Sequence, residues 1–84
     1  MRGVEAKTDE LASLFEAHYA RVARIIVNVI RDPARAEELA VEVFLAWPRL
    51  RRPALPEAWL YRTAVHAAID ELRRRARHRR FLEW

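Results

Sequence analysis

The apolar residues in the first third of the chain recur at steps of three and four positions, which is the period of an α-helix. The pattern predicts a helix of about 20 residues that ends near Ile30. Thr8 or Asp9 is expected to cap its start, because a short side-chain oxygen accepts an otherwise unpaired amide hydrogen. Residues 1–8 lack the pattern and are expected to be flexible. The stripe consists of Leu11, Leu14, Phe15, His18, Val22, Ile25, Ile26 and Val29.

Two further apolar stripes are separated by prolines. Asp32 is the expected N-cap of a second helix and Pro33 its first residue, where the missing amide hydrogen costs nothing. Pro48 disfavours helical geometry at the residue before it and so ends this helix. Three prolines within residues 48–56 predict a constrained basic loop, after which Pro56 opens a third helix. The second stripe is Ala36, Leu39, Ala40, Val43, Phe44 and Trp47, and the third is Leu60, Ala64, Ala67, Ala68 and Leu72, with Ile69 at its edge.

Three helices with short connections predict an all-α fold, a compact three-helix bundle with room for one short extra helical turn. A chain of 84 residues suffices for one small domain, which we place at residues 9–80. Residues 81–84 are expected to start a linker or a tail. The arginine-rich run over residues 73–80 either extends the third helix or frays. Phe81 and Trp84 either fold back on the bundle or mark where a longer chain was cut.

Composition excludes several classes of site. The chain has no cysteine and a single glycine, Gly3. A disulfide scaffold, a cysteine-based zinc site and a glycine-rich phosphate loop are therefore ruled out. The three histidines (His18, His66 and His78) lack metal-ligand spacing, so neither a metal nor another cofactor is expected. No apolar run approaches the length of a membrane span and no secretory signal opens the chain, which favours a soluble, cytoplasmic protein without membrane contact.

Few residues suit catalysis. The hydroxyl groups that could act as nucleophiles lie outside any nucleophile-elbow motif. The adjacent carboxylates Glu37-Glu38 and Asp70-Glu71 point about 100° apart on a helix, so they do not converge and are expected to be solvated. His66 is expected at the surface or at the boundary of the core. We therefore expect no enzymatic activity.

Charge is divided unevenly along the chain. Residues 1–48 carry six basic and eight acidic groups, net −2, whereas residues 49–80 carry ten basic and three acidic groups, net +7. This division predicts two surfaces with different partners, of which the basic one suits phosphate groups. The alternative is a solubilising charged face followed by a disordered basic tail.

Four short motifs, in order, resemble those of one protein family. Residues 36–45, AEELAVEVFL, are similar to the AEDLVQEVFL pattern of bacterial sigma factors. Residues 58–64, AWLYRTA, resemble the family's AWLYRIA, and residues 70–75, DELRRR, resemble the sequence that follows it. Residues 15–19 resemble the FEALY opening of the family's first helix. Over about residues 10–80 the chain thus resembles region 2 of an extracytoplasmic-function (ECF) sigma factor.

The resemblance implies a role in transcription initiation, in which region 2 binds core RNA polymerase and recognises and melts the minus-ten promoter element. In the family, the second helix docks on the clamp helices of the β′ subunit, and an acidic exposed face suits a basic partner. Glu38 stands where the family has Asp, and Val41 replaces a Gln, which removes a polar group. By position, the implied core-binding residues are Arg35, Glu38, Val41 and Glu42. The alternative for these residues is an ordinary solvated face.

The resemblance assigns promoter DNA, in particular the non-template strand, to the loop and the third helix. Aromatic side chains stack on unpaired bases, and arginines bind phosphate. His66 takes the place of the family's Asn, and the loop is shorter than the common form, with Pro48 where a helical residue is usual. The alternative for Trp59 is that it covers the core. The implied DNA contacts are Arg49, Arg51, Arg52, Trp59, Arg62, His66, Arg73, Arg74, Arg75 and Arg77.

Two other functions stay open at this point. Val41 and the short loop also suit a degenerate sigma-like interaction module that binds a protein partner without promoter activity. A small helix-turn-helix regulator fits less well, because a triple-proline loop separates the second and third helices. A sigma factor also carries a region 4 for the minus-thirty-five element, which these residues do not supply. An anti-sigma factor is a further candidate partner.

Overall fold

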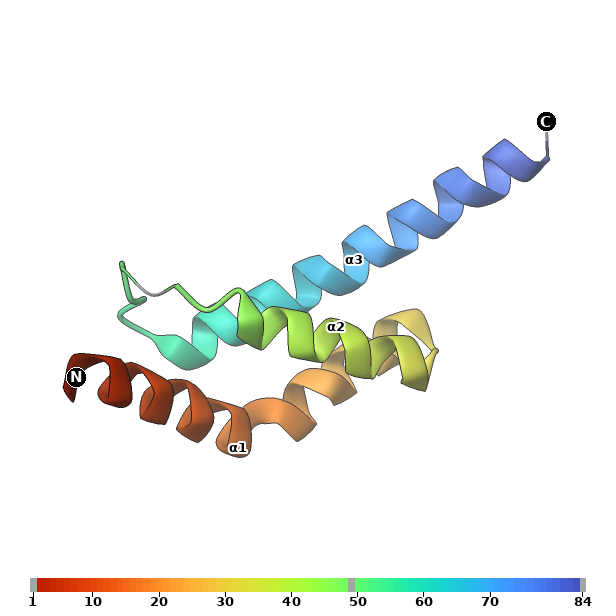
Figure 1. Ribbon diagram of the computed structural model, residues 1–84. Helices are drawn as coiled ribbons and strands as arrows, with labels where there is room; N and C mark the ends of the chain where they lie inside the picture. Colours follow the sequence, from red (N-terminus) through yellow and green to blue (C-terminus); the bar gives the residue numbers. More distant parts are fainter. Residues whose placement is uncertain (1, 49, 84) are drawn as a thin grey trace.

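The computed structural model describes residues 2–48 and 50–83, with side chains from Glu10 onward. The backbone forms three α-helices, α1 (Arg2–Ile30), α2 (Pro33–Leu45) and α3 (Pro56–Leu82), and each packs on the other two (Figure 1). No strand occurs in the described ranges. α3 extends past the corner where α1 meets α2, which gives the molecule extents of 55 × 22 × 20 Å. The all-α three-helix bundle predicted from the sequence is confirmed.

The corner between α1 and α2 is made by two residues. Arg31 has a φ of 56°, a left-handed conformation that is uncommon for a residue with a side chain and that turns the chain sharply. Asp32 then adopts an extended conformation, and its carboxylate accepts the amide hydrogen of Arg35 at 3.1 Å. Pro33 is the first residue of α2 and Pro56 the first of α3. The predicted cap and both proline starts are confirmed.

The predicted start of the first helix is wrong. α1 begins at Arg2, so Thr8 and Asp9 lie within the helix and do not cap it. The physical reason is that residues 2–9 contain no proline and several good helix formers, so backbone hydrogen bonding continues even without an apolar stripe. The assignment of residues 1–8 to a flexible segment stays a prediction.

The arginine-rich run continues the third helix. α3 runs without interruption to Leu82, in favour of the first of the two predicted alternatives. Phe81 is 76% exposed and does not fold back on the bundle. Trp84 lies outside the described residues. The connection between α2 and α3 contains no extra helical turn in its described part.

The core lies along the axis shared by the three helices. Ala64 and Ala68 of α3 are fully buried, and their small side chains let α3 approach the other helices closely. Leu60 is also fully buried and begins the α3 stripe. The buried cluster is Val22, Ile26 and Ile30 of α1, Ala36, Leu39, Ala40, Val43 and Phe44 of α2, and Leu60, Ala64 and Ala68 of α3.

The end of the predicted α3 stripe is wrong. Leu72 is 40% exposed, whereas Glu71, expected in solvent, is only 3% exposed. Eleven residues make about three helical turns, so position 71 lies over Leu60 while position 72 is rotated about 100° from it. The sequence predicted an exposed Glu71 because a charged residue is rarely buried unless it is paired.

Candidate functional site

One candidate surface is the exposed face of α2. Glu38, Val41 and Glu42 all lie there, as predicted, and Val41 is 41% exposed. Leu45 lies one turn beyond Val41 and is 72% exposed, which extends the apolar centre of this face. Arg35 borders the face, with its Nη1 atom 2.8 Å from Glu38 Oε2. The result is an apolar strip flanked by carboxylates.

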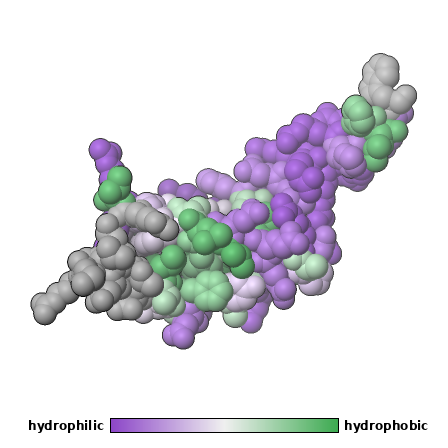
Figure 2. Space-filling model, viewed as in Figure 1, coloured by the Kyte–Doolittle hydropathy of each residue, from purple (hydrophilic) through white to green (hydrophobic). Residues whose placement is uncertain are grey.

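The apolar strip of α2 continues onto α1. Phe15 is 38% exposed, and its ring packs edge-on against Phe44 at 5.1 Å between centroids. Figure 2 shows apolar residues gathered in the middle of the visible face, where α2 lies beside α1. Sequence reasoning missed Leu45 and Phe15 as surface residues. The spacing of four between Val41 and Leu45 could have indicated Leu45, whereas Phe15 belonged to a stripe that also supplies the core.

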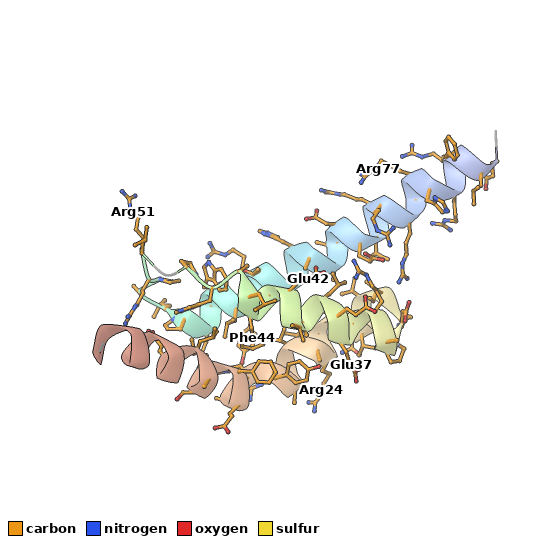
Figure 3. The ribbon with its side chains drawn as sticks, in the orientation of Figure 1. Arg24, Glu37, Glu42, Phe44, Arg51 and Arg77 are labelled. Atoms are coloured by element: carbon orange, nitrogen blue, oxygen red, sulfur yellow. The ribbon has the colours of Figure 1, made fainter. Side chains whose placement is uncertain are left out.

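A second candidate surface is the outward face of α3, which we define as Arg62, His66, Arg73 and Arg77. These side chains are exposed and recur at steps of four, seven and four, so they share one side of the helix. The face is about 22 Å long at 1.5 Å per residue. Arg77 lies on the part of α3 that projects beyond the bundle (Figure 3). Within the described residues, the one ion pair of the outward face is a 4.0 Å contact of Arg73 with Asp70, and both side chains are in solvent.

The loop between α2 and α3 is anchored at both sides. Trp47 is 7% exposed, and its ring meets Trp59 of α3 edge-on at 5.3 Å between centroids. Arg52 forms an ion pair with Glu10 of α1 at 2.8 Å. Arg51 extends from the loop away from the bundle (Figure 3). Trp59 is half-buried against the core, so the core-covering alternative describes a large part of its ring.

The other predicted loop arginine, Arg49, lies outside the described residues. Beside Arg51 in the loop, Leu50 is 93% exposed. The described part of the loop thus presents a basic and an apolar side chain together.

Three of the predicted binding residues meet on Glu71. Arg35 of α2 donates to it at 3.2 Å, and Arg74 and Arg75 of α3 donate at 2.8 and 3.1 Å. We call these four side chains the Glu71 cluster. Hydrogen bonds from Arg74, then Arg75 and Arg35, lower the pKa of Glu71 to about 2, against the opposing effect of burial. Glu71 therefore stays ionised, and the expectation that it is a solvated residue is wrong.

The Glu71 cluster is tied to the α1–α2 corner. Arg75 donates from Nη1 to the carbonyl oxygen of Ile30 at 3.1 Å and from Nη2 to Asp32 at 3.0 Å. It thereby satisfies a carbonyl at the end of α1, which has no partner within the helix. Paired carboxylates also raise the pKa values of two arginines, that of Arg35 mainly through Glu38 and that of Arg74 mainly through Glu71.

Apart from the Glu71 cluster, a group of polar side chains joins α1 to the start of α3. Tyr61 accepts a hydrogen bond from Arg21 at 3.1 Å, and its hydroxyl lies 2.9 Å from His18 Nδ1. His18 Nε2 lies 3.7 Å from Glu57. Tyr61 thus belongs to the contact between α1 and α3. No sequence signal pointed to this contact, because its two sides are 40 to 43 positions apart.

Two negative findings concern the described residues. Among them, no group of three or more histidine, cysteine or acidic side chains is arranged to hold a metal ion. In the same ranges, no helix has the length and apolar character needed to cross a bilayer.

The fold and its surfaces define a class of protein, a helical binding domain with an acidic, partly apolar face on α2 and a basic face on α3. Residues 14–78 match the family model for Sigma-70 region 2. No match was found among curated proteins, and none among solved structures. The chain belongs to the Sigma-70 region 2 family, a non-enzymatic family of sigma factor domains that binds core RNA polymerase and the minus-ten promoter element in transcription initiation.

Proposed function

We propose that the chain acts in the cytoplasm as region 2 of an ECF sigma factor, with α2 on the polymerase and α3 on the promoter. The observation that carries the proposal is the separation of charge between two helices. Glu38 and Glu42 stand in solvent on α2, whereas Arg62, Arg73 and Arg77 stand in solvent on α3. Opposite charges on separate faces let one small domain steer toward a basic protein surface and toward phosphate at the same time.

The α2 face suits the β′ clamp helices. Stable protein interfaces combine an apolar centre with a polar rim. Val41 and Leu45 supply an exposed apolar centre, and Glu38 and Glu42 supply the rim. Val41 thus replaces the polar group of the family's Gln with apolar area beside Leu45. Arg35 contributes from the edge, where its pair with Glu38 holds that carboxylate in place.

The outward face of α3 and the loop suit the non-template strand of the minus-ten element. Arg62, Arg73 and Arg77 form a row that follows a phosphate backbone, and arginine contacts to phosphate position a strand without reading its sequence. Base recognition falls to His66, Trp59 and the loop, because an exposed polar ring can bond to an unpaired base and the accessible part of an aromatic ring can stack on one. Arg51 and Arg52 lie at the loop end of this row. The contacts predicted for Arg49, Arg74 and Arg75 stay predictions.

Binding of the isolated β′ clamp helices tests the polymerase half of the proposal. We expect Glu42→Arg to weaken binding about tenfold or more, because it places a positive charge opposite a basic surface. Glu16→Arg is the matched control, since Glu16 is an exposed glutamate of α1 and lies outside the proposed face of α2. Equal effects of the two substitutions, or no binding by the unaltered chain, would overturn this half.

Binding of single-stranded minus-ten DNA in the presence of core polymerase tests the promoter half. We expect affinity to depend on base sequence and to fall in Arg62→Ala. If the chain binds the clamp helices while promoter DNA is neither bound nor transcribed, the interaction module without promoter activity is the better description.

A further inference from the structure

The arginines of α3 fall into two groups that differ in what they already bind. Arg73 is 72% exposed in its side chain, and its contact with Asp70 is long. Arg75 is 32% exposed and uses Nε, Nη1 and Nη2 to donate to Glu71, Ile30 and Asp32. Two residues apart on a helix means about 200° apart around it, so Arg73 and Arg75 point to opposite sides. A strand that runs along the outward face therefore passes Arg73, whereas three partners hold the guanidinium of Arg75 away from that face.

We propose that Glu71 is a positioning residue that withholds Arg75 from DNA and holds α3 against the α1–α2 corner. Phosphate binding then falls to the outward face, which the same contacts orient. The inference rests on the proposed function. The sequence assigned phosphate contacts to Arg73, Arg74, Arg75 and Arg77 alike, and the inference removes Arg75 from that set.

The connections of the Glu71 cluster favour retention of Arg75 over its release to phosphate. Moving Arg75 to a phosphate would remove one of three donors from a carboxylate whose side chain is 2% exposed. It would also leave the carbonyl of Ile30 without this donor, beside the N-cap of α2. The guanidinium of Arg75, which belongs to α3, therefore contacts both the end of α1 and the N-cap of α2. Arg74, which is 59% exposed, lies between the two groups.

The salt dependence of DNA binding separates the two roles. For single strands, the logarithm of the binding constant falls against the logarithm of salt concentration with a slope of about 0.7 for each phosphate contact. Binding of a fluorescent single-stranded oligonucleotide to the full chain gives this slope. We expect Arg73→Ala to reduce the slope by about 0.7 and to leave the melting temperature unchanged. We expect Arg75→Ala to lower the melting temperature and to leave the slope unchanged.

Two further variants keep the test decisive if Arg75→Ala does not fold. Arg75→Lys retains a charge for phosphate but cannot replace three donors in fixed geometry, so we expect a lower melting temperature with an unchanged slope. Glu71→Gln removes the charge that holds the arginines, so we expect a steeper slope as they reach phosphate. A merely structural role for Glu71 would not steepen the slope. The proposal is overturned if Arg75→Ala reduces the slope as Arg73→Ala does, if Arg75→Lys leaves the melting temperature unchanged, or if Glu71→Gln leaves the slope unchanged.

Failure of this inference is distinguishable from failure of the proposed function. Binding that ignores base sequence but shows the expected slopes would contradict the promoter role and support the role of Glu71. Binding that depends on sequence but loses equal slope in Arg73→Ala and Arg75→Ala would do the reverse. The absence of any salt-dependent binding by the unaltered chain would overturn both.

Discussion

Replacing the carboxylate of Glu71 by an amide is predicted to destabilise the domain strongly and in a pH-dependent way. Glu71→Gln preserves the shape of the side chain but removes the negative charge that Arg35, Arg74 and Arg75 share. Breaking a buried ion pair by removing one partner leaves uncompensated charge, which typically costs about 3–5 kcal/mol. Because Arg74 is 59% exposed and the amide still accepts a hydrogen bond, we expect a smaller effect.

The pKa of Glu71 gives a second magnitude from the same contacts. The folded value of about 2 lies below the ordinary value of 4.5. At roughly 1.4 kcal/mol for each pKa unit, the charged form contributes about 3 kcal/mol to the free energy of unfolding. Allowing for solvent around Arg74, we predict a loss of about 2–3 kcal/mol at neutral pH. For a domain of this size that corresponds to a fall in melting temperature of roughly 10–20 °C.

The sign of the pH dependence follows from the direction of the shift. A carboxylate whose pKa is lowered on folding stabilises the folded state above its unfolded pKa, and this contribution is lost as pH falls through its folded pKa. The stability difference between the unaltered chain and Glu71→Gln is therefore greatest at neutral pH and shrinks between 4.5 and about 2. Urea denaturation followed by circular dichroism over this range measures it.

A neighbouring substitution provides the control. Asp70→Asn removes the same charge from the preceding residue, whose side chain is 75% exposed, and we expect it to change stability by less than about 0.5 kcal/mol. A Glu71→Gln effect as small as that of Asp70→Asn, or one that is constant with pH, would contradict the stabilising role of the Glu71 carboxylate.

Three other substitutions test the packing and capping arguments. Leu60→Ala empties a fully buried position and is expected to cost about 2–5 kcal/mol in urea denaturation; a cost below about 1 kcal/mol would mean that the site collapses or is not core. Asp32→Ala removes both the N-cap of α2 and a partner of Arg75, and we expect a loss of about 1–2 kcal/mol by the same measurement, against almost none for the exposed control Glu37→Ala. Trp59→Ala is expected to abolish the near-ultraviolet circular dichroism of its edge-on pair with Trp47 and to weaken DNA binding across sequences; an unchanged spectrum would contradict the loop anchor.

Helix boundaries marked by proline could be predicted because the chemistry of a single residue determines them. Asp32 accepts the amide hydrogen of Arg35, three residues ahead. Proline is tolerated only in the first turn of a helix, which is where Pro33 and Pro56 lie. The start of α1 was not predictable in this way. Residues 2–9 have no apolar stripe, and their helix-forming composition is a weak signal on its own.

The Glu71 cluster was not predictable, because its contacts are distant in the sequence. Arg35 and Glu71 are 36 positions apart, and Arg75 and Ile30 are 45 apart. Sequence alone shows Arg73, Arg74 and Arg75 as three equivalent charges. The fold makes them different, because rotation around the helix turns one toward solvent and another toward the α1–α2 corner.

The surfaces proposed for function could be predicted from the sequence only in part. The step of four from Glu38 to Glu42 predicts a shared face on a helix, and both side chains are exposed. The apolar extension through Leu45 and Phe15 depends on how α1 packs beside α2, which periodicity does not specify. Local patterns therefore predicted which side of α2 is exposed, and tertiary packing determined which other residues join that side.

In the proposed function, one domain uses α2 for polymerase and the outward face of α3 for minus-ten DNA. The most direct measurement is the affinity of a panel of single-stranded minus-ten oligonucleotides for core RNA polymerase, with and without the chain. We predict sequence-dependent binding that requires the chain. Glu42→Arg should reduce this binding by weakening the complex with polymerase, and Arg73→Ala should reduce it equally for every oligonucleotide. Equal affinity for all sequences, or binding that Glu42→Arg and Arg73→Ala both leave unchanged, would contradict the proposed function.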